Sequence, residues 1–248
     1  TMQDCYVGGG QQDAVSLHGA STLVATQCDI RGGFSGNVVF TPVYGVIADQ
    51  QSQVHLSNCL VTGGSRGWVH STFFGGNGVG MFGSSRGWFV DCTLQAYQSG
   101  YAGVGLEALS TVPPVLERVL TKNNAALSPS VVGTTQNGVL LGLSGNTPLV
   151  RGSTLQLEFA TRPGFPVIAH VSLQLAAPGS FSVVAQPVWG FAQYSLQFAF
   201  AFADGQGHAT VPFTIPNSPW LKDLPMWFCG WSEQNLPVQL SPVLGGLI

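Results

Sequence analysis

Short apolar and polar stretches alternate along the first half of the chain, and they recur as three similar copies. Each copy has a Val, a Ser six positions later and a Cys 13 positions after the Val (15 to 28, 46 to 59 and 79 to 92). Between the Ser and the Cys, apolar residues fall at every second position, as at Leu23 and Ala25. A period of two is typical of β-strands and not of helices. The pattern therefore predicts short strands in a repeated unit.

Repeats of this length, with glycines at their turns, predict a right-handed parallel β-helix over residues 1–124. Each coil then lies on the previous one, and equivalent residues stack about 4.8 Å apart in ladders. We expect coils to start near Val15, Val46, Val79 and Val104. The expected ladders are a buried column of small thiols and a column of hydroxyls at a turn: Cys28, Cys59 and Cys92, and Ser21, Ser52, Ser85 and Ser110. A further polar column is expected at a turn: Gln27, Asn58 and Asp91.

The two remaining cysteines are left open at this point. Five cysteines are an odd number without C-x-x-C spacing, which argues against a disulfide framework. Cys5 and Cys229 can pair only if the two ends of the chain meet.

The second half follows a different pattern. The repeat stops at residue 124, and we expect a linker over residues 125–137 and an antiparallel, Ig-like β-sandwich over residues 138–248. Eight strands are expected near residues 139–143, 154–160, 167–175, 181–188, 194–202, 209–215, 226–231 and 238–243. In the fifth, one face is expected to meet a core through Leu196, Phe198, Phe200 and Phe202. The predicted fold class is all-β.

Charged residues make up only 8% of the chain, with 8 Lys and Arg against 11 Asp and Glu. So few cations do not build the basic patch that nucleic acid requires. No apolar run reaches the roughly 18 residues of a membrane span. We expect neither a nucleic-acid partner nor a membrane span.

Three motifs of the second half carry a family resemblance. Residues 145–157 read Gly-Asn-Thr-Pro-Leu-Val-Arg-Gly-Ser-Thr-Leu-Gln-Leu, and residues 204–217 read Asp-Gly-Gln-Gly-His-Ala-Thr-Val-Pro-Phe-Thr-Ile-Pro-Asn. Leu221, Leu224, Met226 and Trp231 follow. Together they resemble the C-terminal β-sandwich module of secreted planctomycete-type bacterial surface proteins, a module without assigned catalytic residues.

The first half resembles the pectate-lyase-like superfamily of parallel β-helices, but without its catalytic motifs. Both resemblances imply export. We therefore expect an extracellular or cell-surface chain whose signal peptide has been removed.

Catalytic chemistry has little support in the sequence. A β-helix that cleaves acidic polysaccharide needs clustered carboxylates, yet Asp29 aligns with Leu60 and Thr93 in the repeat. Convergence of Arg86, Asp91 and Glu107 through loops remains open. The five His residues show no metal-binding spacing, so no metal is expected. Because the sequence contains no catalytic constellation, no cofactor and no enzymatic activity are expected either.

A structural protein that self-assembles into a filament, sheath or surface layer fits these patterns best. Coil ends expose strand edges, and few charges are present to discourage pairing with other copies of the chain. The alternative is a protein that binds or processes polysaccharide on an aromatic face of the β-helix. The candidate aromatic contacts for assembly or glycans are Phe34, Tyr44, Trp68, Phe73, Phe74, Trp88, Tyr97, Tyr101, Trp220, Trp227 and Trp231.

Overall fold

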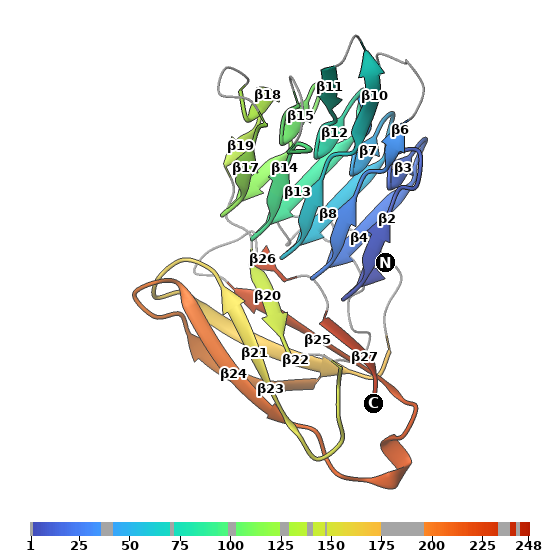
Figure 1. Cartoon of the computed structure of the whole chain (residues 1–248). Coiled ribbons are helices and arrows are strands. Elements are labelled where there is room, and N and C mark those ends of the chain that lie inside the picture. The colour runs from blue at the N-terminus through green and yellow to red at the C-terminus, as the bar shows by residue number, and fades with distance from the viewer. Residues whose placement is uncertain are drawn as a thin grey trace. The chain divides into compact units, whose positions relative to one another are not determined.

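The chain forms two compact units, Thr1–Gly138 and Val139–Ile248, each built almost entirely from β-strands (Figure 1). The computed structural model describes residues 2–35, 42–69, 72–98, 103–124, 129–137, 141–146, 148–174, 196–232, 239–241 and 244–248. The first unit is a parallel β-helix and the second consists of antiparallel sheets, which confirms the predicted fold class.

Three parallel sheets form the β-helix, and Figure 1 shows their strands stacked from blue to green. Sheet A contains β1 (Met2–Gln3), β4 (Thr22–Thr26), β8 (Gln53–Ser57), β13 (Arg86–Val90), β16 (Val115–Glu117) and β19 (Gln136–Asn137). Sheet B contains β2 (Tyr6–Gly8), β5 (Asp29–Arg31), β9 (Leu60–Thr62), β14 (Thr93–Gln95) and β17 (Leu120–Lys122). Sheet C contains β3 (Val15–Leu17), β7 (Val46–Ala48), β12 (Val79–Met81), β15 (Leu106–Ala108) and β18 (Val131–Gly133).

Strict alternation of side chains produces the interior of the β-helix. In sheet B the middle residue of each strand points inward, and Ile30, Val61 and Leu94 are fully buried. In sheet C the first and third residues point inward, as Val79 and Met81 do. Every coil thus adds one layer of apolar side chains to a continuous core.

The inserts between coils form a small additional sheet. It contains β6 (Phe34–Ser35), β10 (Ser65–Val69) and β11 (Thr72–Gly75), in which β10 pairs with β6 in parallel and with β11 as a hairpin. The inserts between coils, which vary in length, therefore extend the β-structure of neighbouring coils.

The turn between sheets A and B has the same backbone conformation in every coil. Its first position has a positive φ of 44° to 53° at Asp4, Gln27, Asn58, Asp91 and Arg118. The polar column expected at Gln27, Asn58 and Asp91 lies at this turn and extends by one residue at each end. Asn and Asp adopt this left-handed conformation more readily than most residues.

Directly after this position lies the column of cysteines. The strand register places Cys28, Cys59 and Cys92 level with one another, and each is buried. Cys5 precedes them in the same column, because Tyr6 pairs with Asp29. Its Sγ atom lies 3.2 Å from Cys28 Sγ. Cys229 lies elsewhere, buried in the second unit, and all five cysteines are free thiols.

The fourth coil begins at Leu106 and not at Val104. Val79 pairs with Leu106 and Met81 with Ala108, a register two residues later than the expected one. Gly105 explains this position: a Cβ there would lie 2.4 Å from the Leu94 carbonyl oxygen, so the turn before the strand requires glycine.

The serine column is correspondingly shorter than expected. Ser52 and Ser85 are buried before their sheet A strands, and Ser21 occupies the equivalent place before β4. Trp88 pairs with Val115, which sets Ser85 level with Val112 and takes Ser110 out of the column. Ser110 instead donates a hydrogen bond to the Val112 carbonyl within its own turn.

Part of the segment expected as a linker belongs to the β-helix. Residues 129–137 carry β18 and β19, which pair with β15 and β16. This partial fifth coil continues the parallel pairing because Val131 and Gln136 fall in register with Leu106 and Val115.

The second unit contains two antiparallel sheets. One contains β20 (Gly142–Gly145), β21 (Thr154–Ala160) and β24 (His208–Thr214). The other contains β22 (Pro166–Ser172), β23 (Leu196–Phe202), β25 (Pro225–Ser232), β26 (Gln239–Leu240) and β27 (Leu244–Leu247). Their shared core includes Leu157 and Phe159 from one sheet and Val167 and Phe228 from the other. A short 3-10 helix, η1 (Pro219–Leu221), precedes β25, and the strand expected near 181–188 lies outside the described residues.

Strand β23 differs from its expected orientation. A bulge occurs where Ala169 pairs with Ala199 while His170 pairs with Gln197, so the side-chain alternation shifts by one residue. Ala199 and Ala201 consequently pack against the core together with Phe198. Leu196, Phe200 and Phe202 are exposed by 71%, 52% and 64%, and the prediction that they face the core is wrong.

Candidate functional site

The candidate aromatics of the β-helix occupy different surroundings. Phe34, in β6, is 46% exposed. Tyr44 is buried, and its ring lies over Gly80, where a Cβ would approach Tyr44 Cε1 to 2.5 Å. The Tyr44 hydroxyl donates to Glu107 Oε2 at 2.7 Å. Tyr44 therefore joins coils within the chain and is not available as a surface contact.

Trp88 stacks on the imidazole of the preceding coil. Val24, His55 and Trp88 form one column on the outer side of sheet A, and the rings of His55 and Trp88 lie 4.4 Å apart at 14°. Val24 and His55 are nevertheless buried. Burial lowers the pKa of His55 well below its ordinary value, so this imidazole is neutral.

The remaining β-helix aromatics do not form a described groove. Tyr97 follows the last residue of β14 in sheet B, and its amide donates to the Gly76 carbonyl. Tyr97 thus lies two residues beyond a strand of sheet B, whereas Trp88 lies on sheet A. Four other candidates have side chains that lie outside what the structure describes: Trp68, Phe73, Phe74 and Tyr101.

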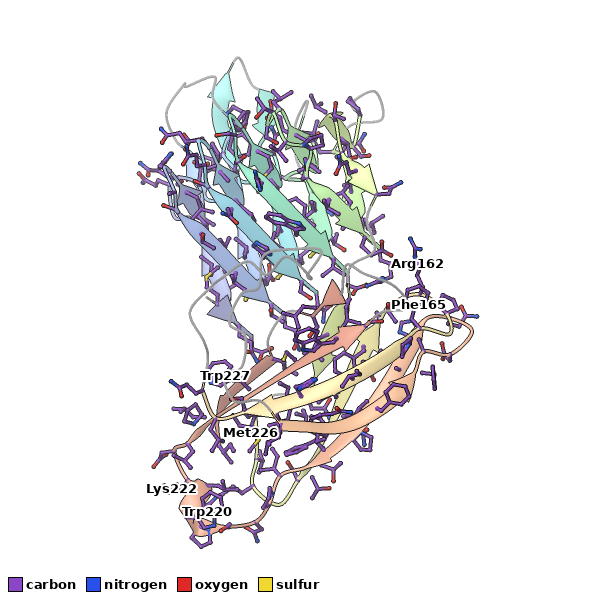
Figure 2. The ribbon with its side chains drawn as sticks, turned by 180° about the vertical axis from the view of Figure 1, so that it is seen from behind. Arg162, Phe165, Trp220, Lys222, Met226 and Trp227 are labelled. Carbon is purple, nitrogen blue, oxygen red and sulfur yellow. The ribbon has the colours of Figure 1, made fainter. Side chains whose placement is uncertain are left out.

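The aromatics near the C-terminus divide between surface and interior. Trp220 in η1 is 69% exposed, and it lies with Lys222 on one turn of the second unit (Figure 2). Trp227 is half-buried and packs over Gly245. Trp231 is half-buried, with its ring 6.1 Å from that of His170. Of the three, Trp220 presents the largest apolar surface to solvent.

The candidate residues Arg86, Asp91 and Glu107 do not converge. Asp91 accepts two hydrogen bonds from Arg118, at 2.6 and 2.9 Å, at the turn between sheets A and B. Glu107, on sheet C, accepts hydrogen bonds from Tyr44 and from Asn77 Nδ2. Arg86 is exposed at the start of β13. These contacts assign structural roles to Asp91 and Glu107 and leave Arg86, Asp91 and Glu107 without a shared site.

Within the described ranges, no group of three or more His, Cys, Asp or Glu side chains is arranged to hold a metal ion. In the same ranges no helix is long and apolar enough to cross a membrane.

A hollow of about 460 Å³ lies in the second unit and was not predicted from the sequence. Its lining is mainly apolar, with Val171, Leu196, Phe213, Trp220 and Met226 among the contributors. The nearby Ser172 hydroxyl donates to the Gln174 carbonyl and accepts from the Gln174 amide, which satisfies it locally. Such a lining suits an apolar side chain better than an acid–base reaction.

In the part of the chain that the structure describes, the sheets of the β-helix end in edge strands. Among the described strands, β2 and β17 close sheet B at opposite ends, and β3 and β18 do the same for sheet C, so each has a pairing neighbour on one side only. Tyr6 in β2 is 66% exposed and Leu120 in β17 is 52% exposed. Each end of sheet B therefore combines a strand edge with a large apolar side chain.

Comparisons of the chain with protein-family models and with curated proteins gave no match.

Proposed function

We propose that this chain is an exported structural protein of the cell surface that assembles with copies of itself, end to end through its β-helix. The exposed edges of sheets B and C carry this proposal. An edge strand offers backbone donors and acceptors to another strand unless charge, bulges or a cap prevent pairing. Export is supported by the resemblance of the second half to modules of secreted bacterial surface proteins and of the first half to the pectate-lyase-like superfamily.

The outer column of sheet B gives the two ends matching chemistry. Tyr6, Asp29, Leu60, Thr93 and Leu120 occupy this column in successive coils. If β17 of one copy pairs in parallel with β2 of the next, Leu120 stacks directly on the neighbour's Tyr6. Both side chains are largely exposed in the single chain, so their burial favours association.

The contact is heterologous, because β17 and β2 are different surfaces of the same chain. A heterologous contact leaves one of the two contact surfaces unoccupied at each end of the assembly. Further copies can bind there, so assembly proceeds to a filament or layer. The strands of every coil run in the same direction, and addition of a copy continues that direction.

The second unit offers a further apolar surface for contact between copies of the chain. Phe200 and Phe202 lie on β23, which among the described strands pairs only with β22, and their rings meet edge-to-face at 4.9 Å. Trp220 adds an exposed indole. These side chains provide apolar contact area without charge.

The placement of the β-helix aromatics favours assembly over glycan binding. A glycan groove on this unit requires its aromatic rings to lie along one face, whereas Trp88 lies on sheet A and Tyr97 lies beyond the end of a sheet B strand. The Tyr44 hydroxyl already donates a hydrogen bond to Glu107, and its ring is buried.

The test introduces a charge at one end of sheet B. We expect the wild-type chain to show a sedimentation coefficient that rises with concentration. Leu120→Lys weakens this association by at least about tenfold, because it replaces the apolar contact with Tyr6 by an ammonium whose burial beside an apolar neighbour is unfavourable.

Val150→Lys is the matched control. Val150 is 53% exposed and lies in a turn of the second unit, so it receives the same charge at similar exposure without changing a strand of the β-helix. Association of Val150→Lys should equal that of the wild type. A wild-type chain that stays monomeric at millimolar concentration, or equal effects of the two substitutions, contradicts the proposal.

A further inference from the structure

Cys5 and Cys28 are held side by side by the backbone on both sides of them. The Asp4 amide donates to the Thr26 carbonyl at 3.1 Å, and the Asp29 amide donates to the Cys5 carbonyl at 3.0 Å. These bonds bracket the two cysteines, whose Sγ atoms lie 3.2 Å apart. Adjacent strands lie about 4.8 Å apart, within the Cα separation of roughly 4.4–6.8 Å that a disulfide requires.

We propose that Cys5 and Cys28 form a disulfide when the protein meets an oxidising small-molecule disulfide, and that this bond fastens the N-terminal half-coil to the first full coil. The half-coil consists of β1 and β2, which pair within the described chain only with β4 and β5. The bond joins the turn that connects β1 and β2 to the turn that connects β4 and β5. This inference is independent of self-assembly.

The reaction proceeds by two thiol–disulfide exchanges. The Cys5 thiolate attacks one sulfur of oxidised glutathione, forms a mixed disulfide and releases glutathione as a thiolate. The Cys28 sulfur then attacks the Cys5 sulfur and releases the second glutathione. The two protons lost by the cysteines are taken up by the two glutathione thiolates, so two thiols are oxidised and one glutathione disulfide is reduced.

Access determines which thiol reacts first. Cys5 is half-buried, whereas Cys28, Cys59 and Cys92 are 2–3% exposed. The buried thiols also donate hydrogen bonds to backbone carbonyls, Cys59 to Ser57 and Cys92 to Val90. A solution oxidant therefore meets Cys5 first, and Cys28 is the sulfur in contact with it.

The rate should follow the ionisation of both thiols, since contact with Cys59 and burial raise the pKa of Cys28 as well. Burial, contact with Cys28 and the nearby Asp4 carboxylate raise the pKa of Cys5 to about 11. At neutral pH the thiolate fraction is small and increases about tenfold for each unit of pH. Oxidation of the folded chain should accelerate correspondingly between about pH 7 and pH 9.

The experiment incubates the reduced full chain with oxidised glutathione, blocks remaining thiols and maps the cysteine peptides by mass spectrometry. We expect a linked peptide that joins Cys5 to Cys28, with Cys59, Cys92 and Cys229 blocked as free thiols after denaturation. Amide exchange in Tyr6–Gly8 should slow by at least about tenfold in the oxidised chain, because the bond suppresses fraying of the half-coil.

Two variants separate the steps. In Cys28→Ala the reaction stops at a glutathione adduct on Cys5, because the resolving thiol is missing. Cys92→Val is the matched control: Val119 already occupies the equivalent place in the next coil, so this variant should form the Cys5–Cys28 bond at the wild-type rate. A stable glutathione adduct in the wild type, a bond between other cysteines or no reaction at all overturns the proposal.

Discussion

The inner face of sheet A provides a sharp test of coil stacking, because two adjacent coils fill the same space with different side chains. In β13 the inward residues are Gly87 and Phe89, while in β8 they are Val54 and Leu56. A Cβ on Gly87 would lie 2.8 Å from Phe89 Cζ. The ring of Phe89 therefore occupies the volume that Gly87 leaves empty. Copying Val54 and Leu56 into β13 should keep the total volume nearly constant.

The magnitudes follow from packing. Gly87→Val alone forces atoms into the Phe89 ring and should cost about 1–3 kcal/mol. Phe89→Leu alone leaves a small cavity and should cost about 1–2 kcal/mol, less than the roughly 3–5 kcal/mol of a change from Phe to Ala. In the double variant the added Val side chain fills the space that Phe89→Leu leaves, so the loss of unfolding free energy should be below about 1 kcal/mol. The coupling free energy is then about 2 kcal/mol.

The assay is equilibrium unfolding in urea of the wild type, both single variants and the double variant. Because the chain has two compact units, the coupling is read from the transition in which the β-helix unfolds. Costs that add to within about 0.5 kcal/mol mean that Gly87 and Phe89 do not share one space. That result would refute the inward orientation of both residues in β13.

Three further predictions address other parts of the chain. Burial lowers the pKa of His55 below its unfolded value of about 6.5, so the stabilising contribution of the neutral imidazole is complete above that pH. As the pH falls below it, the free energy of unfolding should decrease by up to about 1.4 kcal/mol per pH unit. Urea titrations from pH 7 to 4 should show this slope, and His55→Leu should reduce it. Gly78→Ala should lower the stability in thermal unfolding by more than about 3 kcal/mol, because the new Cβ would lie 2.5 Å from a carbonyl oxygen of the next coil. Gly205 has open space around it, so Gly205→Ala should change stability by less than about 0.5 kcal/mol. Phe198→Ser should destabilise the second unit by about 2–4 kcal/mol and Phe200→Ser by under about 1 kcal/mol; the opposite order would contradict the bulge in β23.

The coils could be predicted from the sequence because a parallel β-helix repeats its local requirements. The alternation at Leu23 and Ala25 and the spacing from Val to Cys reflect the same three strands in each copy. The start of the fourth coil was missed because Val104-Gly105-Leu106 has the apolar spacing of an earlier strand. The useful signal is the glycine that precedes each sheet C strand in the second to fourth coils, Gly45, Gly78 and Gly105, where neighbouring strands leave no room for a Cβ.

Other features of the fold depend on contacts between strands, which the spacing of residue types along the sequence does not reveal. Cys5 lies outside the three copies of the repeat, and its place in the cysteine column appears only through the pairing of Tyr6 with Asp29. In β23, strict alternation predicts a single apolar face, but one bulged residue reverses it and exposes Phe200. A bulge depends on the partner strand, which the alternation within β23 does not encode. For the same reason, the apolar hollow beside Trp220 was not found from the sequence.

Electron microscopy of the purified full chain at high concentration tests the central claim of self-assembly most directly. The account predicts filaments or layers whose β-strands are stacked along the direction of growth, with a repeat of about 4.8 Å in their diffraction. Leu120→Lys should abolish these structures under conditions in which Val150→Lys retains them. Isolated single chains at every concentration tested would contradict the account.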